Sequence, residues 1–119
     1  MTSTDQKCAW DVLLIGGASG TGKSTAAYPL AQQFGAALTE VDDIQRAILA
    51  MTTPAQQPTL HYWHTQPEGM EWTAEGILEL HLSVAEVMKP ALETVIALHL
   101  GEDRPLVLEG DYLVPSLAA

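Results

Sequence analysis

One stretch of this chain places three glycines close together, directly before a lysine and a serine. It reads GASGTGKS over residues 17–24 and matches the pattern of a glycine, four residues, a second glycine, Lys, and Ser or Thr. The glycines let the backbone curl so that successive N–H groups point into one concavity, where a phosphate can bind. Lys23 adds a mobile cation for the β- and γ-phosphates of a nucleotide, and the Ser24 hydroxyl can ligate Mg²⁺. The predicted phosphate-binding residues, with Thr25 near the α-phosphate, are Gly17, Ala18, Ser19, Gly20, Thr21, Gly22, Lys23, Ser24 and Thr25.

The segments on either side of this loop decide between two interpretations. Residues 10–15 form a short continuous apolar run, which predicts a strand buried on both faces. Residues 23–34 carry apolar side chains at helical spacing, with Gly35 placed to end a helix and Pro29 expected to kink it or make one turn irregular. The start of a helix adds the positive end of its dipole to a phosphate site. A glycine-rich turn with a surface lysine is the alternative, and the flanking strand and helix favour the phosphate loop.

Acidic side chains follow two further predicted strands. Asp42 and Asp43 come after one of them, and Glu109 and Asp111 come at the end of the other. In phosphoryl transfer to an alcohol, a carboxylate near the γ-phosphate can orient the hydroxyl and accept its proton. Asp42 is the candidate for this base, although it can also simply cap the next helix. Glu109 can hold the Mg²⁺ shell through water or position the attacking group, so the catalytic candidates are Lys23, Asp42 and Glu109, with Asp43 and Asp111 as candidates for substrate binding.

Two other features could contact a substrate. Arg46 lies one turn into the helix predicted over residues 42–50, where it could bind an anionic group or simply be solvated. Residues 51–72 contain three prolines and show no lasting periodicity, which predicts a long loop. Its HYWH segment at residues 61–64 could cover the acceptor pocket, with Tyr62 as the candidate contact, or anchor the loop on the core. A zinc site is disfavoured there, because no further Cys or His is near enough in the sequence to complete a tetrahedron.

The order of the predicted segments indicates the fold class. Strands at residues 10–15, 36–41 and 105–108 alternate with helices, and a long helical segment begins after Thr73 and is kinked or restarted at Pro90. This order predicts an α/β protein with a parallel sheet and helical crossovers. Ligands in such folds lie at the carboxyl ends of the strands, where the glycine loop and the acidic residues fall.

Composition narrows the classes of partner. The 119 residues carry a net charge of −10, which disfavours nucleic acid because such partners are bound by clustered Lys and Arg. No apolar run approaches the roughly 20 residues of a membrane span, and no secretion signal is visible. Cys8 is the single cysteine, which fits a cytoplasmic location. A small anionic ligand remains compatible with the negative charge, because a local cradle of N–H groups acts at short range.

In the glycine-rich loop and in the two acidic segments that follow the later strands, the chain resembles the P-loop kinases of small molecules, in particular the 2-phosphoglycerate kinase-like and zeta-toxin-like group. The resemblance rests on residues 17–25, on VDDIQRAIL and on VLEGDYLVP, of which only the first is specific by itself. It implies a P-loop NTPase-type sheet that binds ATP and Mg²⁺ and phosphorylates a hydroxyl of a small-molecule acceptor. Gln45 stands where the family has an arginine, and Asp111-Tyr112 replaces an apolar-His pair.

Members of that family continue into a lid helix with arginines, two more strands and an adenine-contacting loop. Since this chain ends at Ala119, we expect a single domain that is incomplete at its C-terminus, and an exposed sheet edge that self-association could cover. Two alternatives remain open at this point. The chain could bind a nucleotide without transferring a phosphoryl group, or it could be a toxin or antibiotic-modifying kinase of the same fold.

Overall fold

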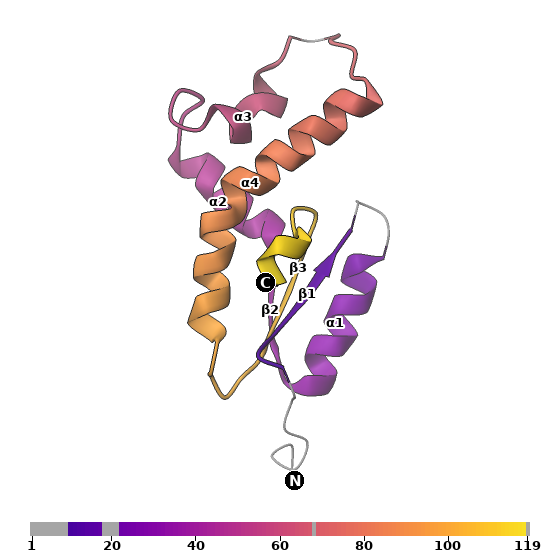
Figure 1. The fold of residues 1–119 in the computed structure, drawn as a ribbon, viewed down its shortest axis with the longest axis vertical. Coiled ribbons are helices and arrows are strands. Elements are labelled where there is room, and N and C mark those ends of the chain that lie inside the picture. The colour runs from indigo at the N-terminus through magenta and orange to yellow at the C-terminus, as the bar shows by residue number, and fades with distance from the viewer. Residues whose placement is uncertain (1–9, 18–21, 68, 119) are drawn as a thin grey trace.

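Three parallel strands form the sheet on which the rest of the chain is arranged. The computed structural model describes residues 10–17, 22–67 and 69–118. The strands are β1 (Val12–Gly16), β2 (Ala37–Glu40) and β3 (Leu106–Gly110), in the spatial order β1-β3-β2. Every residue of the central strand β3 is buried, as expected for a continuous apolar run covered on both faces. The predicted α/β fold with a parallel sheet is therefore confirmed (Figure 1).

The register of the strands brings their carboxyl ends to one edge of the sheet. Gly16 pairs with Gly110, and Glu40 pairs with Glu109. Because paired residues of parallel strands point to the same face, the side chains of Glu40 and Glu109 lie on one side of the sheet. The strand ends that the sequence places far apart are thus neighbours in space.

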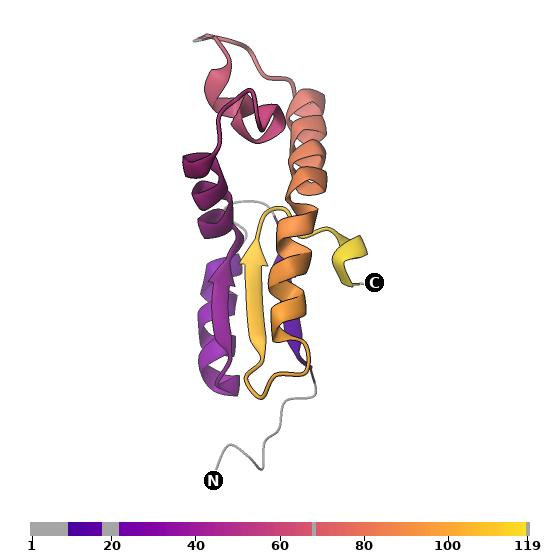
Figure 2. The same ribbon diagram turned by 90° about the vertical axis from the view of Figure 1, so that its left-hand side faces the viewer.

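The two faces of the sheet are covered differently. Helix α1 (Lys23–Phe34) packs on one face through the small side chains of Ala27 and Ala31, against Val107. The opposite face packs against α2 (Val41–Met51) and α4 (Ala74–His99) through larger side chains, among them Met88 and Leu92. Two views show that α2, α3 (Pro58–Thr65) and the first half of α4 extend beyond the ends of the strands (Figures 1 and 2). A helical layer therefore stands next to the edge where the strands end.

The structure bears on four sequence-based expectations about the helices. Residues 58–65 form α3 inside the predicted loop, because Pro58 occupies the first turn, where its missing N–H costs nothing. Helix α4 is continuous through Pro90, which excludes the predicted restart, and it changes direction along its length, which is compatible with the predicted kink (Figure 1). Asp42 does not cap α2, because the helix begins directly after β2 at Val41, with Glu40 in the capping position. Helix α1 likewise runs through Pro29 without a break.

The amino ends of the strands are held by Arg104. Its guanidinium donates hydrogen bonds to the backbone carbonyls of Gly35 at 3.1 Å and Ala36 at 3.3 Å. These contacts join the segment that leads into β3 to the one that leads into β2. Within the described residues, no helix has the length and apolarity needed to cross a membrane. After β3, the described chain closes with a short 3₁₀ turn, η2 (Pro115–Ala118).

Candidate functional site

The loop between β1 and α1 occupies the position that the glycine motif predicts. Strand β1 ends at Gly16, and α1 begins at Lys23, directly after Gly22. Gly22 has a φ of 91°, in the left-handed region that side chains disfavour, so glycine is suited to this start of the helix. The predicted phosphate-binding residues Ala18, Ser19, Gly20 and Thr21 lie outside the described residues. The strand and the helix that the motif requires are both present.

A pocket of about 370 Å³, which we name the strand-end pocket, opens where the three strands end. Helix α1, strands β2 and β3, helix α2 and the turn after β3 all contribute to its walls. It unites seven of the residues singled out from the sequence, together with Glu40 and Gly110. Its lining residues are Gly22, Lys23, Ser24, Thr25, Glu40, Asp42, Glu109, Gly110 and Asp111.

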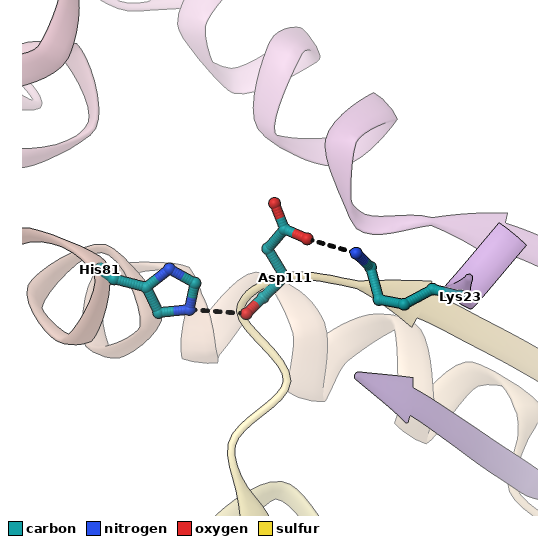
Figure 3. A network of polar contacts seen from close by, with 3 residues as sticks. All are labelled: Lys23, His81 and Asp111. Atoms are coloured by element: carbon teal, nitrogen blue, oxygen red, sulfur yellow. Dashed lines mark hydrogen bonds and ion pairs between the residues drawn. The ribbon is translucent and has the colours of Figure 1, made fainter. Parts of the chain in front are cut away.

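Lys23 is held in this pocket by an ion pair. Its Nζ lies 2.7 Å from Oδ1 of Asp111, and the two side chains are 9% and 25% exposed (Figure 3). A charge pair removed this far from water interacts more strongly than one on the open surface. The ammonium group is therefore fixed at the edge of the sheet, beside the start of α1.

Asp111 also connects the pocket to α4 through its backbone. Nε2 of His81 lies 2.7 Å from the Asp111 carbonyl oxygen (Figure 3). A carbonyl can only accept, so this contact requires the proton on Nε2. The His81 ring also packs against Tyr112, with 4.7 Å between the ring centroids. Figure 3 shows Asp111 between Lys23 and His81, so one residue joins the strand-end pocket to the helical layer.

Glu109 and Glu40 form a pair of carboxyl groups on neighbouring strands. Burial raises the pKa of Glu109, the nearby Glu40 raises it further, and Lys23 acts in the opposite direction. The Tyr28 hydroxyl donates a hydrogen bond to Oε2 of Glu40 at 3.0 Å, and this contact raises the pKa of the Tyr28 phenol. Glu40 is not among the site residues predicted from the sequence, because only the pairing of β2 with β3 places it next to Glu109. Its position as the last residue of a strand was the available signal.

Gly110 sets how closely α2 approaches the pocket. A Cβ at this position would lie 2.3 Å from Cβ of Val41, the first residue of α2, so a side chain there would displace the helix. Because Gly110 lets Val41 pack against the end of β3, Asp42 comes next to the strand ends. The glycine after Glu109 is thus part of what positions the predicted base.

Four predicted residues lie elsewhere. Gly17, Asp43 and Arg46 are exposed and do not line the strand-end pocket. Tyr62 lines a separate recess of about 350 Å³ and packs edge-on against Trp72 at 6.0 Å. In the described part of the chain, no group of three His, Cys, Asp or Glu side chains could hold a metal ion.

A larger pocket of about 570 Å³, the helical pocket, lies between α2, α3 and α4. Asp111 lines both this pocket and the strand-end pocket. Two residues of the HYWH segment contribute to it, whereas His61 anchors the segment by a 3.0 Å hydrogen bond between its Nε2 and the Thr52 hydroxyl. The helical pocket is lined by Gln45, Thr59, Leu60, Trp63, His64, Ile77, Leu80, His81, Val84, Asp111 and Tyr112.

Comparison with known proteins shows a distant similarity to kinases. Two proteins named 2-phosphoglycerate kinase, from Methanococcus maripaludis strains C5 and C6, are each 30% identical to this chain over 115 residues. The alignment covers 89% of this chain and 37% of each relative, so the chain spans little more than a third of their length. No protein-family model and no solved structure matches the chain. The similarity supports a relation to kinases without assigning the chain to a family.

Proposed function

We propose that this chain carries the nucleotide-binding part of an ATP- and Mg²⁺-dependent phosphotransferase, which transfers the γ-phosphoryl group of ATP to a hydroxyl group of a small molecule. The observation that carries the proposal is the convergence of Lys23 and Ser24, at the start of α1, with Asp42 and Glu109 in one pocket at the strand ends. Parallel α/β sheets bind their ligands at this edge.

The residues of the strand-end pocket fit a nucleoside triphosphate. The start of α1 at Gly22 and Lys23 offers backbone N–H groups and a cation to the phosphates, as helix N-termini and glycine loops do elsewhere. Ser24, exposed within the pocket, can supply its hydroxyl to Mg²⁺, while Glu109 can hold water molecules of the metal's shell. Mg²⁺ commonly binds through one or two protein groups, waters and phosphates, so this donor set is sufficient. When bound, the metal neutralises charge that develops on the phosphoryl oxygens.

Asp42 is the proposed general base. It lies in the first turn of α2, and it is exposed within the pocket, where an acceptor hydroxyl can reach it. In the proposed step, the acceptor oxygen bonds to the γ-phosphorus while the bond from that phosphorus to the bridging oxygen of ADP breaks. ADP leaves with the electron pair, and the hydroxyl proton passes to the Asp42 carboxylate.

The test is ADP release measured against a panel of hydroxyl compounds, with 2-phosphoglycerate included because the relatives carry that name. Lys23→Ala and Asp42→Asn should each lower kcat/KM by about 100-fold or more. The matched controls are Lys89→Ala on α4 and Asp103→Asn at the opposite end of the sheet, and both should leave kcat/KM unchanged. If Asp42→Asn turned over every acceptor at the rate of the unaltered chain, its role as the base would be wrong.

Nucleotide binding without transfer is the alternative, because Gly22, Lys23 and Ser24 lie together at the start of α1 and could hold a nucleotide without any part played by Asp42. In that case, ATP should raise Tm, Lys23→Ala should abolish the increase, and no acceptor should be phosphorylated. Failure of every nucleotide to raise Tm would contradict both functions.

We also propose a cytoplasmic location and self-association through an edge of the sheet. Strands β1 and β2 are the two edges of the sheet in the part of the chain described, and unpaired strand edges can pair with a second copy. Light scattering at several concentrations measures the mass of the species in solution, and a monomer at all of them would contradict the self-association.

A further inference from the structure

The helical pocket differs from the strand-end pocket in the chemistry of its walls. Trp63, Ile77, Leu80 and Tyr112 give it apolar and aromatic surface, drawn from three separate segments of the chain. Its volume of about 570 Å³ falls within the range of small-molecule sites. Leu80 and Tyr112 pack against the hydrophobic core, whereas Trp63 and Ile77 are exposed, so the pocket can bury an apolar group that enters from solvent.

The polar groups of the helical pocket include one carboxylate and two imidazoles. Gln45, Thr59, His64 and His81 can donate or accept hydrogen bonds, and Asp111 is the only acidic residue among the described lining residues. That described lining includes neither Lys nor Arg. A carboxylate or phosphate placed here would lose its water without gaining a Lys or Arg partner among the described lining residues, and losing that hydration is costly.

Asp111 indicates how a molecule in the helical pocket would be oriented. This residue lines both pockets, so a molecule in the helical pocket has one end next to the strand-end pocket. Its carbonyl is held by His81, and its carboxylate is paired with Lys23. A hydroxyl at that end of the molecule would therefore lie near the groups proposed to perform the transfer.

We propose that the helical pocket binds the acceptor, and that the acceptor is an uncharged alcohol with an aromatic or branched apolar body. Its body packs against Trp63, Ile77 and Leu80, and its hydroxyl reaches past Asp111 into the strand-end pocket. The inference rests on the proposed function for the role of the hydroxyl, but the selection of a neutral, apolar molecule is a property of the helical pocket itself.

The experiment measures binding without nucleotide, using a matched pair of probes. Cinnamyl alcohol and cinnamate share one aromatic body and differ in charge, and 2-phosphoglycerate serves as a small multiply charged comparison. Ligand-observed NMR titration of the full chain gives an affinity for each probe. We expect cinnamyl alcohol to bind at least about tenfold more tightly than either anion, because only the anions must desolvate a charge.

Two neighbouring residues of α4 provide the variant and its control. Ile77 lines the helical pocket, whereas Leu78 does not, and both are exposed enough, at 46% and 57%, for a charge to be tolerated by the fold. Ile77→Glu should weaken the binding of cinnamyl alcohol by about tenfold, and Leu78→Glu should leave it unchanged. Ile77→Lys should reverse the selection by improving the binding of cinnamate relative to the alcohol.

The outcomes separate this inference from the proposed function. Tighter binding of either anion, binding of no probe, or equal effects of Ile77→Glu and Leu78→Glu would overturn the inference, while ADP release with 2-phosphoglycerate would still support the kinase. Selective binding of the alcohol at the helical pocket, without ADP release from ATP and any bound alcohol, would support the selectivity of the pocket and overturn the transfer.

Discussion

The strand-end pocket and the helical pocket meet at Asp111, but they are built from different parts of the molecule. The former is made mainly from the ends of the strands and the first turns of the helices that adjoin them, and charged side chains dominate its walls. The latter is made mainly from side chains of three helices, with apolar groups in most of its lining. The difference suggests two separate roles. The strand-end pocket would bind the phosphates of the nucleotide, and the helical pocket would select the acceptor.

Gly110→Ala has the largest expected effect of the changes considered, and it acts on the strand-end pocket. The new side chain would push α2, which carries Asp42, away from that pocket. The new methyl group would overlap Val41, so we expect a loss of about 1–3 kcal/mol in the free energy of unfolding, measured by urea denaturation. ADP release should fall with it, because Asp42 moves together with α2.

Gly16→Ala is the matched control, at the position paired with Gly110 on β1. Its Cβ would come within 3.2 Å of the Leu113 carbonyl oxygen, a milder contact, so its stability loss should be smaller. Equal stability of Gly110→Ala and the unaltered chain would show that α2 is not held by this contact.

Glu109→Gln should change how the stability of the chain depends on pH. Glu109 lines the strand-end pocket and not the helical pocket, so this change tests the former. Burial and Glu40 raise the pKa of Glu109, so the folded chain retains this proton at pH values where the unfolded chain has lost it. The contribution of Glu109 to stability therefore falls as pH rises from the ordinary range of Glu through the raised pKa. Relative to the unaltered chain, the Tm of Glu109→Gln should increase between about pH 4 and pH 7.

Glu93→Gln, on the exposed side of α4, controls for the removal of one negative charge. Differential scanning fluorimetry across the pH series gives both differences in Tm. A difference for Glu109→Gln that stays constant with pH would contradict the raised pKa of the Glu109 carboxyl.

His81→Ala should have the smallest effect, and it should change the binding of the acceptor rather than the binding of ATP. The imidazole holds the Asp111 carbonyl and packs on Tyr112, so its loss loosens the junction of the two pockets. We expect KM for the acceptor to rise by about threefold to tenfold, as for the loss of one hydrogen bond, while KM for ATP stays unchanged. His81→Gln, which keeps an N–H donor, should recover part of the loss. A rise in KM for ATP alone would mean that His81 serves the strand-end pocket instead.

Local signals predicted the parts of the site that are continuous in sequence. The glycine spacing indicated residues at the start of α1, and the apolar runs indicated Asp42, Glu109 and Asp111 after the strands; the structure brings these residues together in the strand-end pocket. Glu40 could not be found in this way. Its importance depends on β3 pairing with β2, and the sequence separates these strands by more than sixty residues.

The helical pocket could be predicted only in outline. Prolines on both sides of residues 58–65 suggested a loop, and the eight-residue helix α3 is too short to establish a clear period. The HYWH segment was considered as a cover for the acceptor, yet its members make different contacts. His61 is bonded to Thr52, Tyr62 and Trp63 both pack against Trp72, and Trp63 and His64 also line the helical pocket. These contacts depend on segments outside the HYWH segment, so its own residues could not predict them.

Helix α4 gives the molecule a mechanical property that follows from its length. Its 26 residues correspond to about 39 Å of continuous helix. Met88 and Leu92 fix the second half of α4 on the sheet, whereas the first half lies beyond the strand ends and carries Ile77, Leu80 and His81 (Figure 1). The sheet therefore holds one half of α4, while α3 and the turn after β3 contact the other half. A molecule bound between α3 and α4 would press on the half that the sheet does not hold, and the bond from His81 to Asp111 would carry a shift of that half to the turn after β3.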